Sequence, residues 1–519
     1  DTNTFIGAED TTSTYGVTWD STAVSDGAHS LIAVARDAAG NYATSSAVSI
    51  TVDNTGPTLS SVASSTGITT STISWTTNEA GSSRVDYGTT ASYGSATTSS
   101  TLVTSHSLSI TGLATSTTYH FRIQSTDAQG NATSSSDYTF KTAGYFGLAA
   151  TRARTLAASS TVNTRIMSRS GHVSTDTISS MQVVFQNFKV TSSASQESAT
   201  GAVSAVTASV EYPVGVFTQI LFSGIATGTI PSGGVIFSDR IAVAIPNATT
   251  FWIREYNENA NGIIYNTWQD AGFGERLNAG TTIGDQTLGG TITNVGAFSR
   301  PPLAILATTT KATACIVGDS IAFGHLDTDT SRDARIGIIA KSFPTTLAFV
   351  NLSAGGARAN NYVSQSTARQ QLFPYCSHAV TELGNNDLNV SSDSASTLLS
   401  NLQTIWALFP TDTRKIQATI TPKSSSTDSW ATTVNQTTAS TQAERVSFNT
   451  TIRAGGVSGL TGGYFETATP LETSLNSGIW PVDGTPSKYT ADGLHPSVAG
   501  YDLVVTSGNV DSTDFVYPY

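Results

Sequence analysis

Residues 314–324 read Ala-Cys-Ile-Val-Gly-Asp-Ser-Ile-Ala-Phe-Gly, and this stretch decides the fold of the second half of the chain. A short apolar run, Ala314–Val317, breaks at Gly318-Asp319-Ser320, and an apolar segment resumes at once. The pattern predicts a buried parallel strand that turns sharply into a helix, with Ser320 at the turn. Backbone N–H groups at a helix N-terminus favour negative charge, so they can hold the oxyanion that forms when Ser320 attacks a carbonyl.

Strand-like runs alternate with helical patterns from about residue 310 onward. The strand-like runs are Thr313–Val317, Leu347–Leu352, His378–Leu383 and Ile416–Ile420, and the helical patterns cover Ser394–Phe409 and Gln442–Ala454. Strands that alternate with helices predict a doubly wound parallel sheet. Ligands of such sheets bind beyond the carboxyl ends of the strands, so we expect the functional site at this edge.

Polar residues follow several of these strands at their carboxyl ends. Gly356 comes after the second strand, where a glycine lets its N–H approach the crevice; Gly355 takes this place if the loop is shifted by one residue. Asn386 follows the third strand, and its side-chain NH₂ can point to the same place. Near the end of the chain, Asp492 and His495 stand three residues apart, just before a helical run. One crevice would then hold a hydroxyl, an imidazole, a carboxylate and several N–H donors.

These residues fit nucleophilic catalysis by a serine. His495 would take the proton from Ser320, and Asp492 would hold the imidazole tautomer and stabilise the imidazolium. The N–H groups of Ser320 and Gly356, with the Asn386 amide, would bind the tetrahedral oxyanion. The other histidines lack an acidic residue at the right spacing; they are His29, His106, His120, His172, His325 and His378.

Other residues near these segments have two interpretations each. Asp319 and Asp387 are expected to brace turns rather than to react. Arg358 is a candidate contact for a polar substrate, although a solvated surface arginine is the simpler interpretation. Trp430 and Trp480 fall on the long segments that flank the cleft, where substrate contact and packing both stay open. No Cys/His cluster suggests a metal, and no cofactor is expected.

Residues 310–510 resemble the SGNH hydrolases, also called GDSL esterases. All four blocks of the family are matched, at Gly318-Asp319-Ser320, Asn351–Gly356, Gly384-Asn385-Asn386-Asp387 and Asp492-Gly493-Leu494-His495-Pro496, and isoleucine replaces leucine after the serine. The resemblance implies a catalytic domain over residues 310–519 with a three-layer α/β/α fold and a flavodoxin-like parallel sheet. It implies Ser320 as the nucleophile of a triad with Asp492 and His495. It also implies Gly356 and Asn386 as residues of the oxyanion hole.

The first part of the chain shows strand patterns and turn signals typical of β-sandwiches. Residues 1–55 resemble a bacterial immunoglobulin-like module, through Ala35–Asn41 among other segments. Such modules have additional strands before this point, so we expect an N-terminally truncated module with further modules upstream. Residues 56–143 resemble a fibronectin type III domain, with Trp75 as the core tryptophan and Tyr119 at the tyrosine corner.

Residues 144–309 are again rich in strand patterns and predict a β-sandwich accessory domain of jelly-roll type. Its strand-like runs are Met181–Val190, Val203–Tyr212, Val235–Pro246 and Thr250–Tyr256. Its aromatic residues Trp252, Tyr256, Tyr265 and Trp268 either form a face that stacks on sugars or fill the core. A polar segment, Ser168–His172, is a weaker candidate for a part that reaches the active site.

The composition excludes two classes of function. Of the 519 residues 12% are charged, and the net charge of −12 with a pI of about 4.9 argues against a nucleic-acid partner. No apolar run reaches about 18 residues, so no membrane span is expected. The Ser/Thr/Gly-rich composition is typical of secreted or cell-surface bacterial modules, and the start at Asp1 without methionine indicates a removed targeting segment or a piece of a longer chain.

The two cysteines lie in different segments of the predicted sheet. Cys315 is on the strand before Ser320, and Cys376 begins the strand before Gly384. Counted back from the sheet edge, their depths differ by about five residues, or roughly 16 Å. This separation is too long for a disulfide, so we expect two buried thiols.

Together these features predict a secreted, multimodular serine esterase that works through a Ser320 acyl-enzyme. Low charge and several β-modules favour a polymeric substrate, so acetyl or other acyl groups on a polysaccharide come first, and short-chain esters should also be cleaved. A polyester or a lipid is the alternative within the class. The competing hypothesis is a surface adhesin that keeps the hydrolase fold only for binding.

Overall fold

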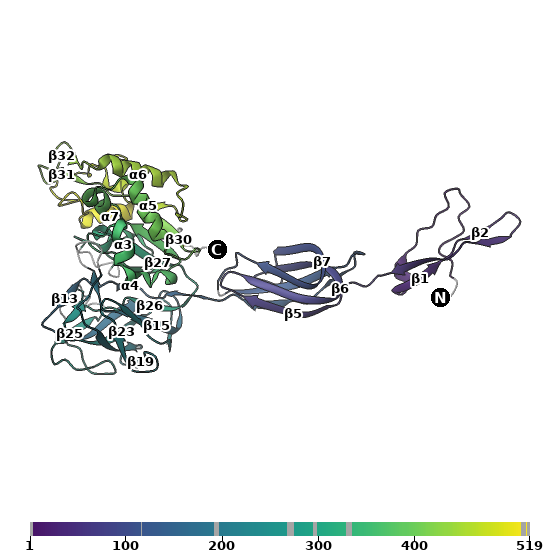
Figure 1. Cartoon of the computed structure of the whole chain (residues 1–519), viewed down its shortest axis with the longest axis horizontal. Helices are drawn as coiled ribbons and strands as arrows, with labels where there is room; N and C mark the ends of the chain where they lie inside the picture. The colour runs from purple at the N-terminus through teal and green to yellow at the C-terminus, as the bar shows by residue number, and fades with distance from the viewer. Residues whose placement is uncertain are drawn as a thin grey trace. The chain divides into compact units, whose positions relative to one another are not determined.

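The computed structural model describes residues 4–115, 117–190, 197–266, 274–293, 298–327, 335–509 and 515. The chain divides into two compact units, the first ending at Gly144 and the second beginning at Tyr145. This division lies next to the boundary that the sequence places between the second and third domains. Figure 1 colours the first unit purple to blue and the second blue-green to yellow.

The first unit is built from antiparallel strands with one short 3₁₀ helix among its described residues. In its first part β1 pairs with β4, and β2 pairs with β3. In its second part the sheet order is β10-β8-β6-β5, with β7 on β6 and β9 on β8. The elements are η1 Ser21–Ala23, β1 Gly27–Leu31, β2 Val34–Arg36, β3 Tyr42–Thr44, β4 Val48–Val52, β5 Leu59–Thr66, β6 Ser71–Gly88, β7 Ser95–Ile110, β8 Thr118–Thr126, β9 Ala132–Ser134 and β10 Tyr138–Lys141.

The second part of this unit has its own apolar core around Trp75. The indole Nε1 of Trp75 donates to Ser125 Oγ at 3.0 Å, and the ring of His106 stacks on the indole with centroids 4.7 Å apart. The hydroxyl of Tyr119 accepts a hydrogen bond from the N–H of Ala114, five residues upstream, at 3.0 Å. Trp75 is therefore buried in the core of this part, and Tyr119 forms a local hydrogen bond with Ala114.

The second unit begins with two facing antiparallel sheets. One has the order β11-β26-β15-β21 with β22 on β15, and the other has the order β19-β18-β23-β14-β25 with β20 on β18. Their inner faces share one apolar cluster. The strands are β11 Tyr145–Leu148, β13 Ala158–Ser160, β14 Arg165–Val173, β15 Ile178–Gln186, β16 Lys189–Val190, β17 Glu197–Ser198, β18 Ser204–Glu211, β19 Phe217–Ile220, β20 Thr227–Ile230, β21 Val235–Phe237, β22 Ile241–Ile245, β23 Thr250–Asn259, β24 Ile263–Tyr265, β25 Arg276–Gly280 and β26 Ala304–Thr309.

The aromatic residues considered for sugar stacking are largely engaged with protein groups. The Arg169 guanidinium lies 4.1 Å from the ring centroid of Trp252, and Tyr256 is buried. Tyr265 packs edge-on against Phe298. Trp268 lies outside the described residues. The polar segment Ser168–His172 belongs to β14, where the buried His172 ring contacts Ser170 Oγ and the Thr151 carbonyl.

A parallel sheet with the order β12-β28-β27-β29-β30-β33 carries the rest of the unit, and all five of its strand pairs are parallel. Numbered from β27 along the chain, the order is 2-1-3-4-5, which is the flavodoxin-like order. The strands are β12 Ala153–Arg154, β27 Thr313–Gly318, β28 Ala348–Asn351, β29 His378–Glu382, β30 Arg414–Ala418 and β33 Tyr464–Phe465. A separate hairpin pairs β31 Ser424–Ser426 with β32 Gln436–Thr438.

Helices cover both faces of this sheet (Figure 1). On one face α1, α2 and α7 pack against Ala314 and Ile316, and on the other α3, α5 and α6 pack around Cys315 and Val317. The helical elements are α1 Ser320–Phe323, α2 Ile338–Ser342, α3 Ala359–Gln365, α4 Thr367–Gln370, η3 Phe373–Tyr375, η4 Asp387–Ser391, α5 Ala395–Trp406, α6 Gln442–Ala454, η5 Thr469–Leu471 and α7 Val498–Ser507.

The second face of the parallel sheet is covered by the β-sandwich as well as by helices. Leu148, Val184 and Leu303 of the sandwich lie in one apolar cluster with Val317 and Val350 of the parallel sheet. The short strand β12, which precedes the sandwich strand β13, pairs in parallel with β28 at the edge of that sheet. The sandwich and the parallel sheet are therefore packed into one unit.

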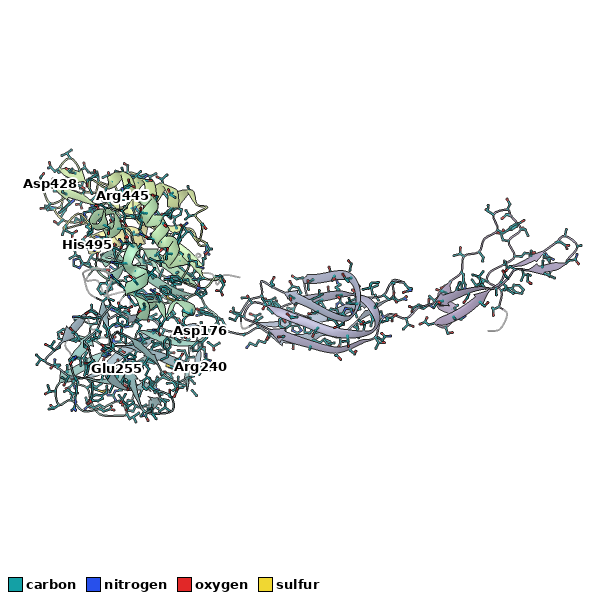
Figure 2. The ribbon with its side chains drawn as sticks, viewed as in Figure 1. Asp176, Arg240, Glu255, Asp428, Arg445 and His495 are labelled. Atoms are coloured by element: carbon teal, nitrogen blue, oxygen red, sulfur yellow. A yellow bond between two sulfur atoms is a disulfide. The ribbon has the colours of Figure 1, made fainter. Side chains whose placement is uncertain are left out.

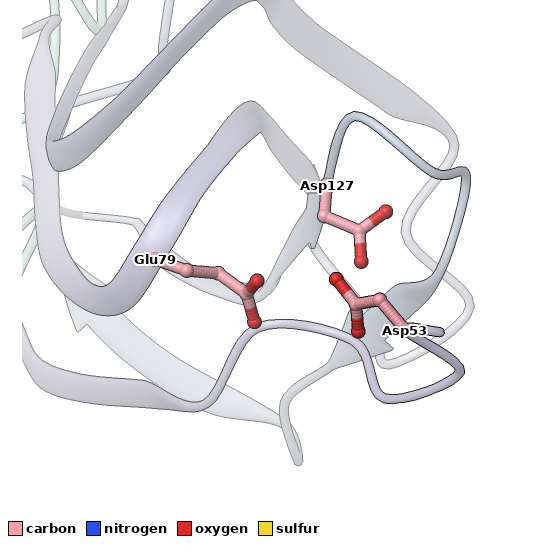
Figure 3. A group of neighbouring side chains, drawn as sticks. All are labelled: Asp53, Glu79 and Asp127. Atoms are coloured by element: carbon pink, nitrogen blue, oxygen red, sulfur yellow. The ribbon is translucent and has the colours of Figure 1, made fainter. Parts of the chain in front are cut away.

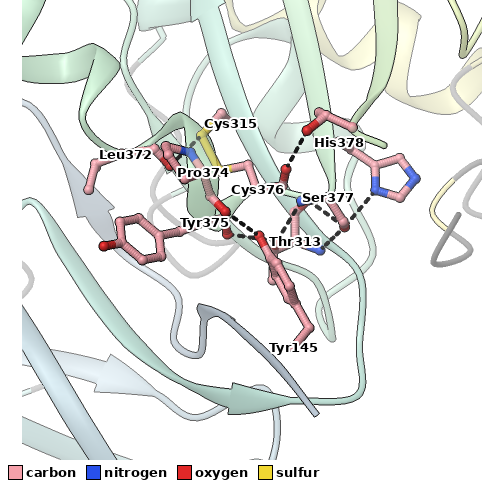
Figure 4. The surroundings of a disulfide bond; sticks show 10 residues. Tyr145, Thr313, Cys315, Leu372, Pro374, Tyr375, Cys376, Ser377 and His378 are labelled. Carbon is pink, nitrogen blue, oxygen red and sulfur yellow. Dashed lines mark hydrogen bonds between the residues drawn. A yellow bond between two sulfur atoms is a disulfide. The ribbon is translucent and has the colours of Figure 1, made fainter. Parts of the chain in front are cut away.

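The prediction of two buried thiols is wrong, because Cys315 and Cys376 form a disulfide with their Cα atoms 5.7 Å apart (Figure 4). The strand β29 begins at His378, and its register places Ala379 opposite Cys315. Cys376 precedes the strand, at the end of η3, where its N–H donates to the Phe373 carbonyl. The turn folds the chain back and brings Cys376 to Cys315. A count of residues that treats Cys376 as part of a continuous strand therefore overestimates the distance between the two cysteines.

Among the described helices, none has the length and apolar composition needed to cross a bilayer.

Candidate active site

Ser320 begins α1 directly after β27, at the carboxyl edge of the parallel sheet. Asp319 is the N-cap residue, and its Oδ1 accepts a hydrogen bond from the N–H of Ile321 at 2.8 Å. At Gly318 an added Cβ would lie 2.4 Å from the Cβ of Ala322. The turn from strand to helix is thus closed so tightly that only glycine fits before Asp319.

The structure brings Ser320, His495 and Asp492 together in a line of hydrogen bonds. Ser320 Oγ lies 2.8 Å from His495 Nε2, and His495 Nδ1 lies 2.7 Å from Asp492 Oδ2. Asp492 Oδ1 also accepts from the N–H groups of His495, at 2.8 Å, and Leu494, at 2.9 Å. His495 is labelled in the part of the chain that carries the parallel sheet in Figure 2.

The environment of Asp492 keeps it ionised. Burial would raise the pKa of this carboxyl, but the hydrogen bonds from the ring and backbone of His495 and from Leu494 outweigh burial and hold the pKa well below its usual range. An ionised Asp492 accepts the Nδ1 proton of His495, which leaves Nε2 to receive the proton of Ser320.

The segments predicted to form an oxyanion hole lie beside the serine turn. The N–H of Ala354 donates to the Gly318 carbonyl at 3.1 Å, which places the loop that contains Gly356 next to this turn. Gly356 has a φ of 72°. Asn386 Nδ2 lies 3.2 Å from Asp319 Oδ2 and 3.3 Å from the Ala357 carbonyl, so the Asn386 amide is joined to both the serine segment and the glycine loop.

Buried carboxyl groups support this edge of the sheet, and one of them is not predicted from the sequence. Glu382, the last residue of β29, accepts hydrogen bonds from the N–H groups of Asp319 and Ala322 at 3.4 and 3.2 Å. Burial, followed by the charge of Asp319, raises the pKa of Glu382 well above its usual value, and burial raises the pKa of Asp319 to about 6. The available signal is an acidic residue inside the strand-like run His378–Leu383.

Asp387 supports the start of α3, whereas Asp319 caps the helix that directly follows it. Asp387 Oδ1 accepts a hydrogen bond from the N–H of Ala359 at 2.8 Å, next to Arg358. Burial raises the pKa of Asp387 to about 7.

The three residues considered as substrate contacts differ in their burial and in their hydrogen-bond partners. Arg358 is half-buried, and its Nη1 donates to Ser391 Oγ at 3.0 Å. Trp430 is half-buried beside Gly493, and its Nε1 donates to Ser424 Oγ at 3.0 Å. Trp480 has an exposed fraction of 0%, so it lies behind the site and has no surface for a substrate.

One group of acidic side chains in the first unit has a geometry that could hold a metal ion. Carboxylate oxygens of Asp53, Glu79 and Asp127 all lie within 4.8 Å of one another (Figure 3). Asp127 also accepts hydrogen bonds from the N–H groups of Gln129 and Asn131, each at 2.8 Å. No Cys/His pattern marks this group in the sequence, because its ligand atoms come from separate strands and turns and are all carboxylates.

Comparisons with known proteins find one family match and several similar solved structures. No curated protein matches the chain. Among solved structures, the chain is similar to a member of the lipolytic protein G-D-S-L family from Veillonella parvula DSM 2008, at 16% identity over 39% of this chain and 98% of that chain, with a TM-score of 0.26. It is also similar to a carbohydrate esterase family 3 protein from Talaromyces cellulolyticus, at 13% identity over 38% and 94% of the two chains, with a TM-score of 0.25.

A further similar structure is described as a peptidoglycan O-acetylesterase, at 9% identity over 76% of this chain and 70% of that chain, with a TM-score of 0.29. In the first unit, residues 13–80 match the family described as bacterial Ig-like domain (group 3). The match crosses the boundary that the sequence places after residue 55. The chain is thus a multidomain, β-rich protein that contains an immunoglobulin-like domain near its start.

Proposed function

We propose that this protein is a serine esterase that hydrolyses carboxylic esters through an acyl-enzyme on Ser320. The observation that carries the proposal is the continuous line of hydrogen bonds from Ser320 Oγ to His495 Nε2, at 2.8 Å, and from His495 Nδ1 to Asp492 Oδ2, at 2.7 Å. All three residues lie at the carboxyl edge of one parallel sheet, and this placement supports the resemblance of the four sequence blocks to those of SGNH hydrolases.

The reaction follows from these contacts. His495 Nε2 removes the proton of Ser320 as Oγ attacks the ester carbonyl, and Asp492 stabilises the imidazolium that forms. The tetrahedral intermediate collapses when His495 returns the proton to the leaving alkoxide, so an alcohol departs and the acyl group stays on Ser320. A water molecule, deprotonated by His495, then attacks the acyl-enzyme and releases the acid with the free serine.

The oxyanion of each tetrahedral intermediate would be held by three donors, the N–H groups of Ser320 and Gly356 and the side-chain NH₂ of Asn386. The contact between Asn386 Nδ2 and Asp319 Oδ2, at 3.2 Å, orients this amide before substrate arrives. The proton that Asn386 Nδ2 directs to the Ala357 carbonyl, at 3.3 Å, would turn to the oxyanion while the contact with Asp319 is kept, and one oxyanion donor is worth about 10²–10³ in rate.

The substrate we favour is an acyl group, acetyl first, on an extracellular polysaccharide, with short-chain esters as further substrates. The low charge of the chain and its array of β-domains support a large, surface-bound substrate, and a polyester or a lipid is the alternative. In this proposal residues 56–143 form a fibronectin type III spacer, and the protein acts outside the cell.

The test is hydrolysis of a chromogenic acetate ester by the wild type, by Ser320→Ala and by Ser364→Ala. Ser364 is an exposed serine on α3 and serves as the matched control. We expect Ser320→Ala to abolish turnover and Ser364→Ala to leave it unchanged. Equal rates for all three proteins would favour the adhesin hypothesis, in which the fold serves only binding.

A further inference from the structure

The backbone of the segment that carries Asp492 and His495 is fixed at Gly493, the glycine between them, by hydrogen bonds and close packing. Gly493 has a φ of +73°, and an added Cβ would lie 1.9 Å from the Ser424 carbonyl oxygen and 2.5 Å from Trp430 Cζ2. The Gly493 carbonyl accepts two hydrogen bonds, from the Ser424 N–H at 3.0 Å and from Trp480 Nε1 at 3.1 Å. Position 493 therefore admits no side chain, and its peptide is held from two directions.

The first holding group is the hairpin of β31 and β32, which the chain forms between β30 and α6 (its Asp428 is labelled in Figure 2). Ser429 and Trp430 at its tip have φ values of 57° and 58°, a left-handed conformation that is uncommon for residues other than glycine. The Ser426 hydroxyl accepts the N–H of Trp430 at 2.9 Å and stabilises this turn. The tip conformation lays the indole of Trp430 against Gly493.

The second holding group is Trp480, which is joined to the same hairpin. Its backbone N–H donates to Gln436 Oε1 at 2.9 Å, and its carbonyl accepts from Gln436 Nε2 at 3.0 Å. Gln436 Oε1 also accepts from Ser424 Oγ at 3.2 Å, and Ser424 Oγ accepts from Trp430 Nε1 at 3.0 Å. Both indoles are thus parts of one hydrogen-bonded network around Gly493.

A third contact closes the catalytic segment on itself. The hydroxyl of Thr490, which has an exposed fraction of 0%, donates to the His495 carbonyl at 2.8 Å and accepts from the Gly493 N–H at 2.9 Å. Asp492, by contrast, has a side chain that is 44% exposed. The side chain that orients His495 is therefore held mainly through the backbone on both sides of it.

We propose that Trp480 and Trp430 are positioning residues for the proposed esterase reaction, which fix Gly493 so that the Asp492–His495 pair stays aimed at Ser320. The inference rests on the proposed function and assigns both tryptophans to the acid–base segment, in place of the substrate contacts considered from the sequence. A misplacement of about 1 Å at a reacting group can cost on the order of 10²-fold in rate, so a small rotation of this peptide is sufficient to matter.

The test compares Trp480→Phe with Trp406→Phe as a matched control. Both tryptophans are buried in the same unit, and each donates its Nε1 proton in one hydrogen bond, Trp406 to Thr381 Oγ1 at 3.0 Å on a helical face of the sheet. We expect Trp480→Phe to lower kcat by about tenfold or more with KM within twofold. We expect both variants to lower the melting temperature by similar amounts. For Trp406→Phe, however, we expect kcat to stay within twofold of the wild type. Equal kcat values for the two variants would overturn the inference, and so would a change confined to KM.

A second measurement is independent of ester turnover. The His495 Nδ1 proton, in its 2.7 Å contact with Asp492, should give a low-field proton NMR resonance. We expect the resonance to shift or broaden in Trp480→Phe and to stay unchanged in Trp406→Phe; an identical resonance in both would contradict positioning. If the wild type hydrolyses no ester, the proposed function fails while this resonance still decides the positioning role. If Trp480→Phe does not fold, the half-buried Trp430→Phe takes its place with the same expected outcomes.

Discussion

The imidazole rings of His325 and His495 meet edge to face, with their centroids 4.5 Å apart and their planes at 64°. The backbone of His325 is fixed on both sides, because its N–H donates to the Ser320 carbonyl at 2.9 Å and its carbonyl accepts from the Tyr501 hydroxyl at 2.8 Å. The sequence alone does not single out His325, because Asp327 stands two residues after it and not three residues before it, as Asp492 does for His495. Its ring nevertheless forms one wall beside the proposed general base.

Removal of the His325 ring should therefore weaken catalysis without abolishing it. An aromatic contact is worth about 0.5–1.5 kcal/mol, so we expect His325→Ala to lower kcat about 2- to 12-fold, because His495 loses a lateral restraint. His325→Phe retains an aromatic ring and should stay within twofold of the wild type. Ester hydrolysis rates of both variants, with His120→Ala in the first unit as a control, give the measurement. Equal losses in the Ala and Phe variants would show that the contact itself does not matter.

The proposed oxyanion role of Asn386 predicts a larger effect. Asn386→Ala removes the NH₂ that Asp319 orients, and we expect kcat to fall about 10²–10³-fold with little change in KM. The control is Asn360→Ala, since Asn360 is exposed and its Nδ2 donates to Ser391 Oγ at 3.3 Å. A loss of less than tenfold for Asn386→Ala would remove this residue from the oxyanion hole.

The carboxyl pair beneath the nucleophile predicts a pH-dependent stability. Burial raises the pKa of Asp319 to about 6, and burial with the charge of Asp319 raises the pKa of Glu382 well above its usual value, so the folded protein holds a proton that the unfolded chain releases. The stabilisation is fully present below the unfolded pKa, near 4.3, and is lost as the pH rises through the folded value. Glu382→Gln removes this titration while its amide can still donate to Asp319.

We therefore expect the free energy of unfolding of the wild type, relative to Glu382→Gln, to decrease by up to about 1.4 kcal/mol per pH unit above pH 4.5. Denaturant unfolding of both proteins at pH 5, 6 and 7 measures the difference. If the free energies of unfolding of the wild type and Glu382→Gln change in parallel with pH, Glu382 is ionised in the folded protein.

The sequence predicted the candidate site more completely than the contacts that support it. Ser320, Gly356, Asn386 and His495 follow strands or segments that reach one sheet edge, and local patterns with a parallel topology are sufficient to bring them together. Glu382 is different, because an acidic residue in a short apolar strand carries no sign of the partner it meets. The contacts that fix Gly493 also leave no local sequence pattern. Ser424 and Trp430 lie 60 or more residues earlier in the chain, and Trp480 lies on a separate loop.

Strand register and very short strands account for the remaining differences between the fold expected from the sequence and the observed fold. The disulfide depends on the strand β29 starting at His378 and on the turn before it, and neither has a periodic signal. The strand β12 has only two residues, too few for an alternation to show. Its pairing with β28 joins the sandwich to the parallel sheet, an arrangement that the hydrophobic pattern of either segment alone does not specify.

The Cys315–Cys376 disulfide predicts a stability effect that is separate from activity. It closes a loop with a sequence separation of 61 residues, and both cysteines are buried. We expect the double variant Cys315→Ala/Cys376→Ala to lose about 2–4 kcal/mol of unfolding free energy, with kcat within twofold at 25 °C, because neither cysteine lies at the carboxyl edge of the sheet. Denaturant unfolding with and without a reducing agent gives the measurement. An unchanged midpoint in the double variant would argue against the bond.

The shared core of the second unit predicts that residues 310–519 do not fold by themselves. Leu148, Val184 and Leu303 of the sandwich would leave apolar surface of the parallel sheet uncovered if the sandwich were removed. The sandwich residue Glu197 also accepts the N–H groups of Ala368 and Arg369, each at 2.9 Å.

Through Arg369 this contact reaches the proposed oxyanion loop, because Arg369 Nη1 donates to the Leu352 carbonyl at 2.8 Å, next to the segment that leads to Gly356. We expect a chain of residues 145–519 to unfold cooperatively and to hydrolyse esters at the full rate. A chain of residues 310–519 should lack a cooperative transition and should show no turnover. Circular dichroism melts and the chromogenic ester assay measure both properties. A folded and fully active 310–519 chain would show instead that the sandwich is a separable appendage, because neither the shared core nor the Glu197–Arg369 contact would then be needed for the catalytic edge.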